Sequence, residues 1–349
     1  MSATHSDRPV DGENGIFGLS VSAERAGVVL LPVPFEATTS YGRGTVDGPR
    51  TIAQASEQVD LYDVETGQPH RAGIAMLPEG PGVRAWNEAA RAAARTVVDA
   101  GEAPNLADTR IARALERVNA ISNDVHEFVE AEVGRWLARD KIVGLVGGDH
   151  SVSYGTLAAH ARRYPGLGVL HIDAHADLRH EYQGFKWSHA SIMENAMRRL
   201  ANIARLVQVG IRDLCEEEHT RIQESNGRIR TYFDAELARE RFEGATWGEQ
   251  VRRVVDDLPQ DVFVSFDVDG LDPTLCPHTG TPVPGGLSFD QATYLVGAVA
   301  RSGRRIVGFD LVEVAPDPDG SEWDGNVGAR LLYKLIGWTL RSRSATQAS

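Results

Sequence analysis

The chain has 349 residues, of which 42% are hydrophobic and 24% charged, and its 36 basic and 49 acidic side chains give a formal net charge of −13. These values are typical of a globular protein with a large core, and they exclude a disordered or fibrous chain. The acidic balance, with no run of Lys or Arg, argues against nucleic acid as a partner.

The two cysteines form no Cys-x-x-Cys pair, which argues against a disulfide framework and favours a reducing compartment. No apolar run approaches the roughly 18 residues that a membrane span needs. We therefore expect a soluble cytoplasmic protein without a membrane partner.

Short apolar runs alternate with longer helical patterns along most of the chain, which indicates an α/β fold with a parallel sheet wrapped by helices. The runs lack polar alternation, as expected of strands that are buried on both faces. We predict strands at residues 28–33, 142–146, 168–173, 206–211, 262–267 and 306–311.

Helical periodicity is clearest before the second of these strands, where apolar residues recur at three- and four-residue steps from Val118 to Leu137. On this helix His126 is not followed by the second histidine of a zinc-protease motif, so we interpret it as part of a solvated face. Further helices are predicted over 83–98, from the cap residue Ser288 to Val299, and over 331–338.

No internal repeat or linker divides the chain, although residues 66–116 form its least regular part. We therefore predict a single domain at residues 28–342, between an N-terminal extension at 1–27 and a C-terminal tail at 343–349.

Polar residues follow the ends of three predicted strands. The segments are Gly147-Gly148-Asp149-His150, Asp173-Ala174-His175-Ala176-Asp177 and Asp267-Val268-Asp269-Gly270. The carboxyl ends of parallel strands meet at one edge of a sheet, so segments far apart in sequence can converge there. Alternate residues of extended backbone point to the same side, which brings the polar residues of each segment together. The sequence thus predicts a nest of ligands.

The carboxylates in this nest would repel one another and take up protons unless cations lay between them. Two divalent ions cancel four carboxylate charges, and two neutral histidines complete the set of ligands. The candidate ligands are His150, Asp173, His175, Asp177, Asp267 and Asp269. Oxygen and nitrogen ligands suit manganese, iron, cobalt or nickel, with zinc not excluded. The alternative, that each segment is only a turn rich in Asp and Gly, requires three coincidences at separate strand ends.

Together with the segment 279–286 and the pair Glu313-Val314, these motifs resemble the ureohydrolase family of arginases, agmatinases and related guanidino hydrolases. The resemblance extends from about residue 28 to about residue 338. It implies a three-layer α/β/α fold around a mostly parallel sheet of eight strands. It also implies how the metals are held: His150 and Asp177 bind one ion, His175 and Asp269 bind the other, and Asp173 and Asp267 bridge both.

By the same resemblance, a metal-bridging hydroxide attacks a linear amidine and cleaves a guanidino C–N bond. Glu313 matches the family carboxylate that holds the guanidinium, and His189 matches the histidine that shuttles a proton. The expected cofactors are two divalent ions per subunit, Ni²⁺ or Mn²⁺. Family members commonly form trimers or hexamers, so we expect a homotrimer or homohexamer, with a hetero-oligomer of related subunits left open.

The loops set the substrate. Residues 178–188 replace the arginase-type loop that grips the α-carboxylate, and Cys215 stands where arginases carry an acidic residue, so arginine is disfavoured. The chain is similar to a branch that includes nickel-dependent guanidine hydrolases and enzymes acting on alkylguanidines or biguanides such as metformin. A pocket closed by Trp187, Phe185 and Met193 would favour such a compact substrate. The products would be urea and ammonia from guanidine, or guanylurea and dimethylamine from metformin.

Two other interpretations stay open. Agmatine, cleaved to putrescine and urea, would need only an acidic or aromatic site for its distal ammonium, and Glu181 is the candidate residue. A scaffold subunit without activity is a hypothesis of another class. The candidate substrate-pocket residues are Arg179, Trp187, Cys215 and Thr281.

Overall fold

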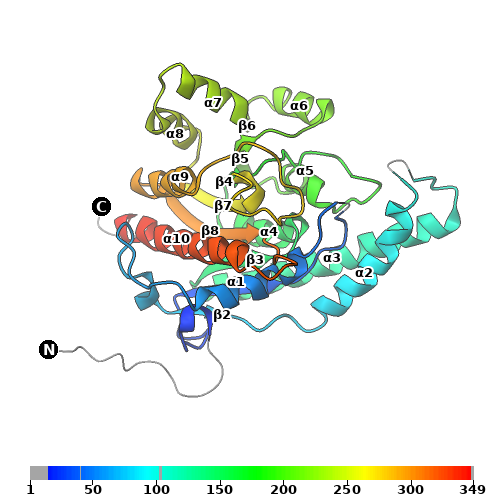
Figure 1. The fold of residues 1–349 in the computed structure, drawn as a ribbon, viewed down its shortest axis with the longest axis horizontal. Helices are drawn as coiled ribbons and strands as arrows, with labels where there is room; N and C mark the ends of the chain where they lie inside the picture. The colour runs from blue at the N-terminus through cyan, green and yellow to red at the C-terminus, as the bar shows by residue number, and fades with distance from the viewer. Residues whose placement is uncertain (1–14, 40, 102–103, 347–349) are drawn as a thin grey trace.

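The computed structural model describes residues 15–39, 41–101 and 104–346. At its centre lies one eight-stranded sheet in the order β2-β1-β3-β8-β7-β4-β5-β6, and every neighbouring pair is parallel (Figure 1). The strands are β1 (Val28–Val33), β2 (Ile74–Met76), β3 (Ile142–Gly147), β4 (Leu167–Ile172), β5 (Ile203–Ile211), β6 (Ile229–Phe233), β7 (Asp261–Asp267) and β8 (Arg305–Val312).

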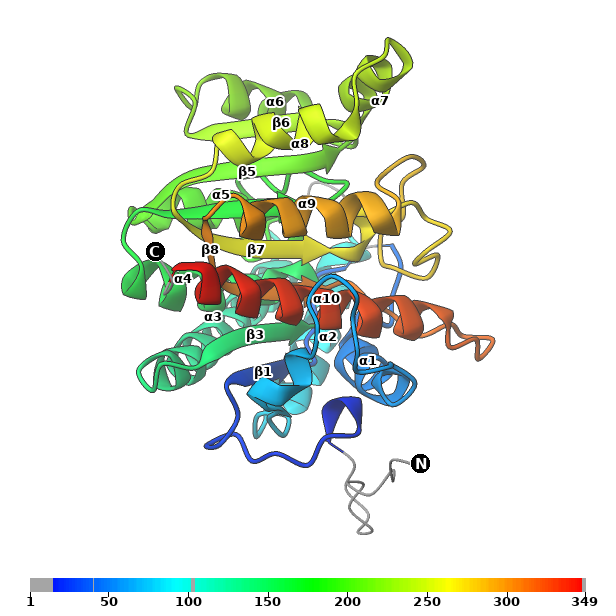
Figure 2. The same ribbon diagram turned by 90° about the vertical axis from the view of Figure 1, so that its left-hand side faces the viewer.

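Helices cover both faces of this sheet. The helices are α1 (Gly48–Ser56), α2 (Val83–Val98), α3 (Thr109–Leu137), α4 (Ser153–Arg163), α5 (Ile192–Arg199), α6 (Glu216–Gln223), α7 (Asp234–Phe242), α8 (Trp247–Asp256), α9 (Phe289–Arg301) and α10 (Trp323–Thr346). Helices α1, α8, α9 and α10 lie over one face, and α2, α3, α4 and α5 lie over the other (Figure 2). The expected three-layer α/β/α fold is confirmed.

Strand β1 shows why the apolar runs lack alternation. Val28 and Leu30 join the hydrophobic cluster under α10, whereas Val29 and Leu31 join the cluster under α3. Successive side chains point to opposite faces, and both faces are covered, so every position is apolar. The strand is fully buried as a result.

All six predicted strands are present, and the capping box of Ser288 with Gln291 begins α9 as predicted. The sequence runs did not reveal β2 and β6, which are the two edges of the sheet. β2 has only three residues, and β6 is buried at one position out of five, so neither gives a buried-strand pattern. Helix α3 begins at Thr109, so the irregular part of the chain is shorter than predicted.

The predicted domain boundaries do not coincide with breaks in the structure. Within the predicted extension, Ile16 and Phe17 are buried, and the ring centroid of Phe17 lies 5.0 Å from that of Tyr333. Helix α10 continues past the predicted start of the tail to Thr346. Residues 1–14 of the predicted extension and 347–349 of the predicted tail lie outside the described residues.

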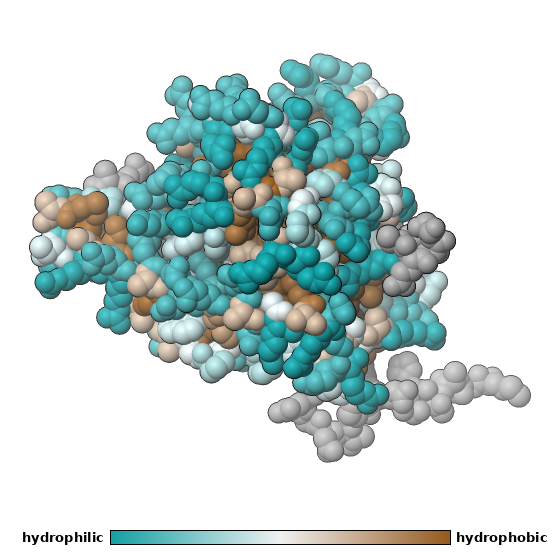
Figure 3. Space-filling view, turned by 180° about the vertical axis from the view of Figure 1, so that it is seen from behind, coloured by the Kyte–Doolittle hydropathy of each residue, from teal (hydrophilic) through white to brown (hydrophobic). Residues whose placement is uncertain are grey.

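The surface seen in Figure 3 is mainly hydrophilic, with hydrophobic side chains in small separate groups. Of the helices in the described part of the chain, none combines the length and apolar character that crossing a bilayer requires.

Candidate metal centre

The candidate ligands come from the carboxyl ends of β3, β4 and β7. His150 begins the short helical turn after β3, Asp173 directly follows β4, and Asp267 is the last residue of β7. Glu313 directly follows β8, which lies between β3 and β7. Because all strands run in the same direction, these ends lie at one edge of the sheet.

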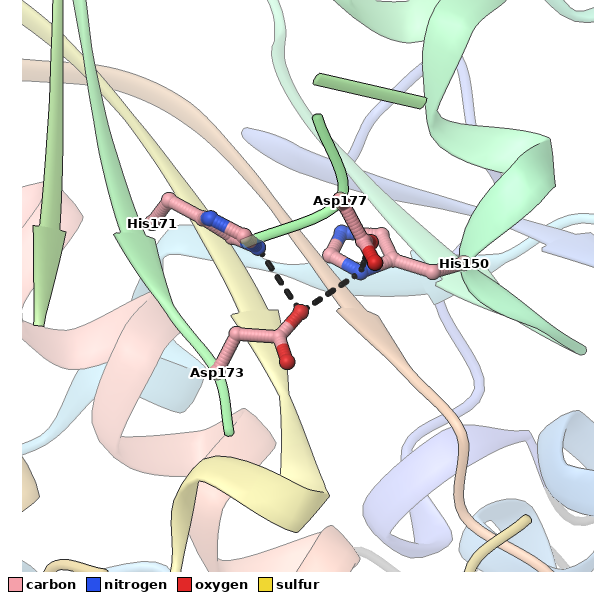
Figure 4. Close-up of side chains that lie close together, drawn as sticks. All are labelled: His150, His171, Asp173 and Asp177. Carbon is pink, nitrogen blue, oxygen red and sulfur yellow. Dashed lines mark hydrogen bonds and ion pairs between the residues drawn. The ribbon is translucent and has the colours of Figure 1, made fainter. Parts of the chain in front are cut away.

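Three carboxylates converge on one nitrogen of His150. Nδ1 of His150 lies 3.1 Å from Oδ2 of Asp173, 3.1 Å from Oδ2 of Asp177 and 3.4 Å from Oδ2 of Asp267. Figure 4 shows the carboxylates of Asp173 and Asp177 directed at this ring. His150 and the three carboxylates around it are buried, so water does not screen the carboxylates from one another.

A second group adjoins the first. Nδ1 of His175 lies 3.0 Å from Oδ2 of Asp269 and 3.5 Å from Oδ1 of Asp173. Asp173 therefore belongs to both groups, one through each carboxylate oxygen. All six predicted ligands are brought together in this way.

The surroundings of His150 fit a cation. Ser265 Oγ donates its hydrogen to the carboxylate of Asp310, at 2.9 Å from Oδ1, so it can only accept from Nε2 of His150 at 2.9 Å. Assigned from these partners, Nε2 carries a ring hydrogen, and Nδ1 is the nitrogen that faces the three carboxylates. Three buried carboxylates around Nδ1 call for a positive charge, which a proton on the ring or a bound cation would supply.

The crowding of buried carboxylates raises the pKa of two of them. Burial, followed by the charge of Asp173, raises the pKa of Asp177 to about 6. Burial, together with Asp269 and Asp173, raises the pKa of Asp267 well above its usual range. Divalent cations would offset both effects, and oxygen and nitrogen donors of this kind suit divalent metal ions. The donor set therefore fits bound metal.

Glu313 and His189 lie beside the ligands. Glu313 is buried, and its Oε1 accepts a hydrogen bond of 2.8 Å from the backbone N–H of His150. Nδ1 of His189 lies 4.0 Å from the same oxygen. Within the described residues, Oε2 of Glu313 and Nε2 of His189 have no hydrogen-bond partner although both atoms are buried. Buried polar atoms are usually paired, so these two are available for a polar ligand.

Burial shifts both groups toward their neutral forms. Burial, then Asp267 and Asp149, raise the pKa of Glu313 well above its usual range. Burial, then His175 and His150, lower the pKa of His189 to about 4. A cationic ligand beside Glu313 would favour its ionised form.

Two of these functional residues have unusual backbone conformations. Asp177 has φ of 54° and Glu313 has φ of 65°, which is the left-handed region that residues with a Cβ rarely adopt. Backbone hydrogen bonds hold each in place, from Met193 N to Asp177 O at 3.1 Å and from Glu313 N to Gly148 O at 2.9 Å. Such strained residues cluster at functional sites.

A cavity of about 160 Å³ opens beside the candidate ligands His175 and Asp177. Its lining residues are His175, Asp177, Arg179, Tyr182, His189, Ala190, Asp213, Glu218 and Thr281. Arg179 lies at 3.6 Å from Glu218 and stacks over the ring of Tyr182 at 5.2 Å, and Thr281 donates to Asp269 at 3.2 Å. The structure thus places Arg179 and Thr281 at the predicted pocket.

The predicted aromatic wall is not formed. The ring centroid of Trp187 lies 4.5 Å from that of His126, outside the cavity lining. Phe185 is buried in a cluster with residues of α2 and α3, and Met193 in another with residues of β4 and β5. These side chains gain more free energy by burial in the core than they would at a wet rim.

Two further interpretations need correction. His126 is buried rather than solvated, and its position three residues before Val129 places it on the apolar side of α3. Cys215 is the residue before α6 and is not among the residues that line the cavity.

Sequence reasoning missed several polar residues around the ligands. They are His171, Gln208, Asp213, Glu218, Ser265 and Asp310. For two of them the alternation of side chains along a strand was an available signal. His171 and Ser265 each stand two residues before a candidate ligand, so each points to the same side of the sheet as that ligand.

Comparisons with known proteins bear on the family and the fold. Residues 26–337 match the arginase family. The chain is 32% identical over 314 residues to N(1)-aminopropylagmatine ureohydrolase of Thermus thermophilus, covering 90% of each chain, and 34% identical over 214 residues to an agmatinase of Halalkalibacterium halodurans, covering 61% of this chain and 69% of that one. The fold is similar to that of agmatine ureohydrolase from Thermoplasma volcanium, with a TM-score of 0.73, 23% identity, and coverage of 96% of this chain and 97% of that chain.

Proposed function

Because this chain belongs to the arginase family, we propose that it is a metal-dependent hydrolase of guanidino compounds, with a compact guanidine, N-alkylguanidine or biguanide as substrate. The observation that carries the proposal is the position of Glu313, whose unpaired Oε2 lies beside the convergent ligands. A buried carboxylate next to a cation-binding nest suits a planar cation that is to be attacked at carbon.

The side chains have distinct tasks in this reaction. Glu313 accepts hydrogen bonds from the N–H groups of the guanidinium and fixes the plane of the substrate. The hydrogen bond from the backbone N–H of His150 in turn fixes the carboxylate of Glu313. A Cβ at position 280 would lie 3.1 Å from Oε2 of Glu313, so Gly280 leaves room for substrate at that oxygen. When bound, the two divalent ions lower the pKa of water and supply the nucleophile.

His189 completes the site. Its neutral ring can take a proton at Nε2 and deliver it to the departing nitrogen, and no hydrogen bond to the described residues has to break first. Water adds to the guanidino carbon, and the C–N bond breaks. Guanidine then yields urea and ammonia.

Two charged groups on the cavity bear on substrate choice. Arg179 at the rim pairs with Glu218 at 3.6 Å, so this carboxylate is already matched by a cation, and the cavity of about 160 Å³ suits a small molecule. Asp213 favours the second candidate, agmatine or a related amine, because its side chain is 66% exposed and lies 3.9 Å from His175. The names of the relatives in Thermus thermophilus and Halalkalibacterium halodurans also support a substrate with a cationic tail.

One experiment tests both candidates. Protein loaded with Mn²⁺ or Ni²⁺ is offered guanidine, methylguanidine, dimethylguanidine, metformin, agmatine, guanidinobutyrate and arginine together, and products are identified by mass spectrometry. Selective loss of a compact guanidine or biguanide supports the first candidate, and putrescine supports the second. Absence of turnover with either metal contradicts the proposal that the chain is an enzyme and favours the hypothesis of a scaffold subunit.

The Asp213→Asn variant sharpens this test. If Asp213 binds a distal ammonium, the variant raises KM for agmatine and leaves KM for methylguanidine unchanged. Equal effects on both would show that Asp213 does not distinguish them.

We also propose a homotrimer or homohexamer in the cytoplasm, with a related second subunit as the alternative. Family membership supports the oligomer. Native mass spectrometry of the purified chain tests it, since a monomer that becomes active only with a related chain would favour the alternative.

A further inference from the structure

A row of polar side chains crosses the sheet behind the metal centre. Its members pair in register on five adjacent strands: Asp310 on β8, Ser265 on β7, His171 on β4, Gln208 on β5 and Thr231 on β6. Four of them are completely buried. We call this set the polar row. Polar residues are rare at the centre of a sheet buried on both faces, so the row needs an explanation.

One arm of the row supports His150, as described above through Ser265 and Asp310. The other arm begins at Asp173, the ligand shared by both metal groups. Nε2 of His171 lies 2.8 Å from Oδ2 of Asp173, and Figure 4 shows this ring directed at the carboxylate. Each arm thus ends on a different ligand.

Gln208 fixes the proton of His171. The carbonyl of Ala176 can only accept, so the group 2.7 Å from it is the Nε2 amide nitrogen of Gln208. The second amide hydrogen is directed at Nδ1 of His171 at 3.0 Å, and Oε1 accepts from Thr231 Oγ1 at 2.9 Å. Only this orientation of the Gln208 amide gives both its nitrogen and its oxygen hydrogen-bond partners.

This orientation determines the tautomer of His171. Because Nδ1 accepts from Gln208, the ring hydrogen lies on Nε2 and is donated to Asp173. Oδ1 of Asp173 meanwhile accepts from the backbone N–H of His175 at 2.5 Å. Both oxygens of the shared ligand are therefore held before any metal binds.

We propose that His171 is a positioning residue, which the polar row locks in one tautomer so that Asp173 is preset for two metal ions. The inference rests on the proposed metal centre. Hydrogen bonds to metal ligands typically contribute 10- to 100-fold in metal affinity. We expect a loss of this size when the donor of His171 is removed.

The test measures metal affinity and the position of the ring hydrogen of His171. It does not depend on turnover. His171→Met removes the donor and keeps a buried side chain, whereas His171→Gln retains a donor at a position similar to Nε2. The affinity of each full-length variant for MnCl₂ and NiCl₂ is measured by chelator competition. We expect 10- to 100-fold weaker binding for His171→Met and nearly normal binding for His171→Gln.

His160 provides the matched control. It is also completely buried, but it bonds to Thr156 on α4 rather than to a ligand. His160→Met should lower stability and leave metal affinity unchanged. A His171→Met affinity equal to that of the wild type would overturn the inference, as would an equal loss in His160→Met.

A second measurement needs no metal. In metal-free wild-type protein labelled with ¹⁵N in the histidine rings, His171 should show a protonated Nε2 and an unprotonated Nδ1, identified by the signal lost in His171→Gln. The opposite tautomer or a doubly protonated ring would overturn the inference. Failure of the wild type to bind either metal would instead contradict the metal centre itself, and the inference with it.

Discussion

His189 and Glu313 approach each other from loops that follow different strands, with Nδ1 and Oε1 4.0 Å apart. One side chain is a neutral base and the other a buried carboxylate with a raised pKa. Neither lies within the nest of candidate ligands, so the proposed metal binding and the proposed proton transfer can be tested by separate mutations.

The first prediction concerns His189→Ala. The variant should retain both metal ions and lose about 10²- to 10⁴-fold in kcat, the usual contribution of a positioned acid or base. Metal content is measured by elemental analysis and kcat by urea release. His180→Ala, an exposed histidine of the same loop, is the control and should behave as the wild type. Loss of metal in His189→Ala would contradict a purely catalytic role.

Glu313→Gln tests the guanidinium site. Glutamine keeps an acceptor for the backbone N–H of His150 but lacks the charge that pairs with the substrate. We expect a loss of about 2–5 kcal/mol in kcat/KM, as for other buried charge pairs. Steady-state kinetics with metal content measured in parallel checks this, and an unchanged kcat/KM would remove Glu313 from the substrate site.

Asp267→Ala should abolish metal binding and turnover together. Asp267 lies 3.4 Å from Nδ1 of His150 and is a candidate bridging ligand. Asp261→Ala is the control on the same strand, because Asp261 pairs with Arg305 at the opposite end of β7. Full activity in Asp267→Ala is the result that would refute the metal assignment.

His126 makes stability depend on pH. Burial lowers its pKa to about 3, and neither ring nitrogen has a partner among the described residues. The unfolded chain takes up a proton near pH 6.5 whereas the native state does not, so this contribution to stability is complete above pH 6.5 and is lost as pH falls toward 3. Between pH 7.5 and 5.0 the loss amounts to about 2 kcal/mol.

His126→Phe should remove that part of the pH dependence while preserving contact with the rings of Trp187 and Tyr154. Urea unfolding of metal-free protein at the two pH values measures the difference. His219→Phe, at an exposed position, is the control and should retain the wild-type dependence. An equal loss of stability in wild type and His126→Phe would show that His126 is not the titrating group.

The cluster of candidate ligands could be predicted because each set of residues is local in sequence. Asp173, His175 and Asp177 need only a strand end and a spacing of two, and the parallel sheet brings the sets together. The six central strands could be predicted for a similar reason, since burial on both faces leaves an apolar run.

The polar row could not be predicted, because it depends on register between distant strands. His171 meets Gln208 across 37 residues of sequence, and Gln208 meets Thr231 across 23. The prediction of an aromatic pocket wall was wrong for a related reason. Phe185 looks like a pocket residue in its loop, and only the path of that loop toward α2 and α3 shows that it is buried.

The central position of β8 constrains the order in which the protein can assemble. β8 is the last strand to be synthesised, yet it alone joins β3 to β7. Before residues 305–312 leave the ribosome, the chain can form only two separate half-sheets, with His150 on one and the other five ligands on the other. Long-range parallel pairing is slow. An ion that reached the nascent chain would thus meet an incomplete set of candidate ligands, and the full set comes together only once β8 is in place.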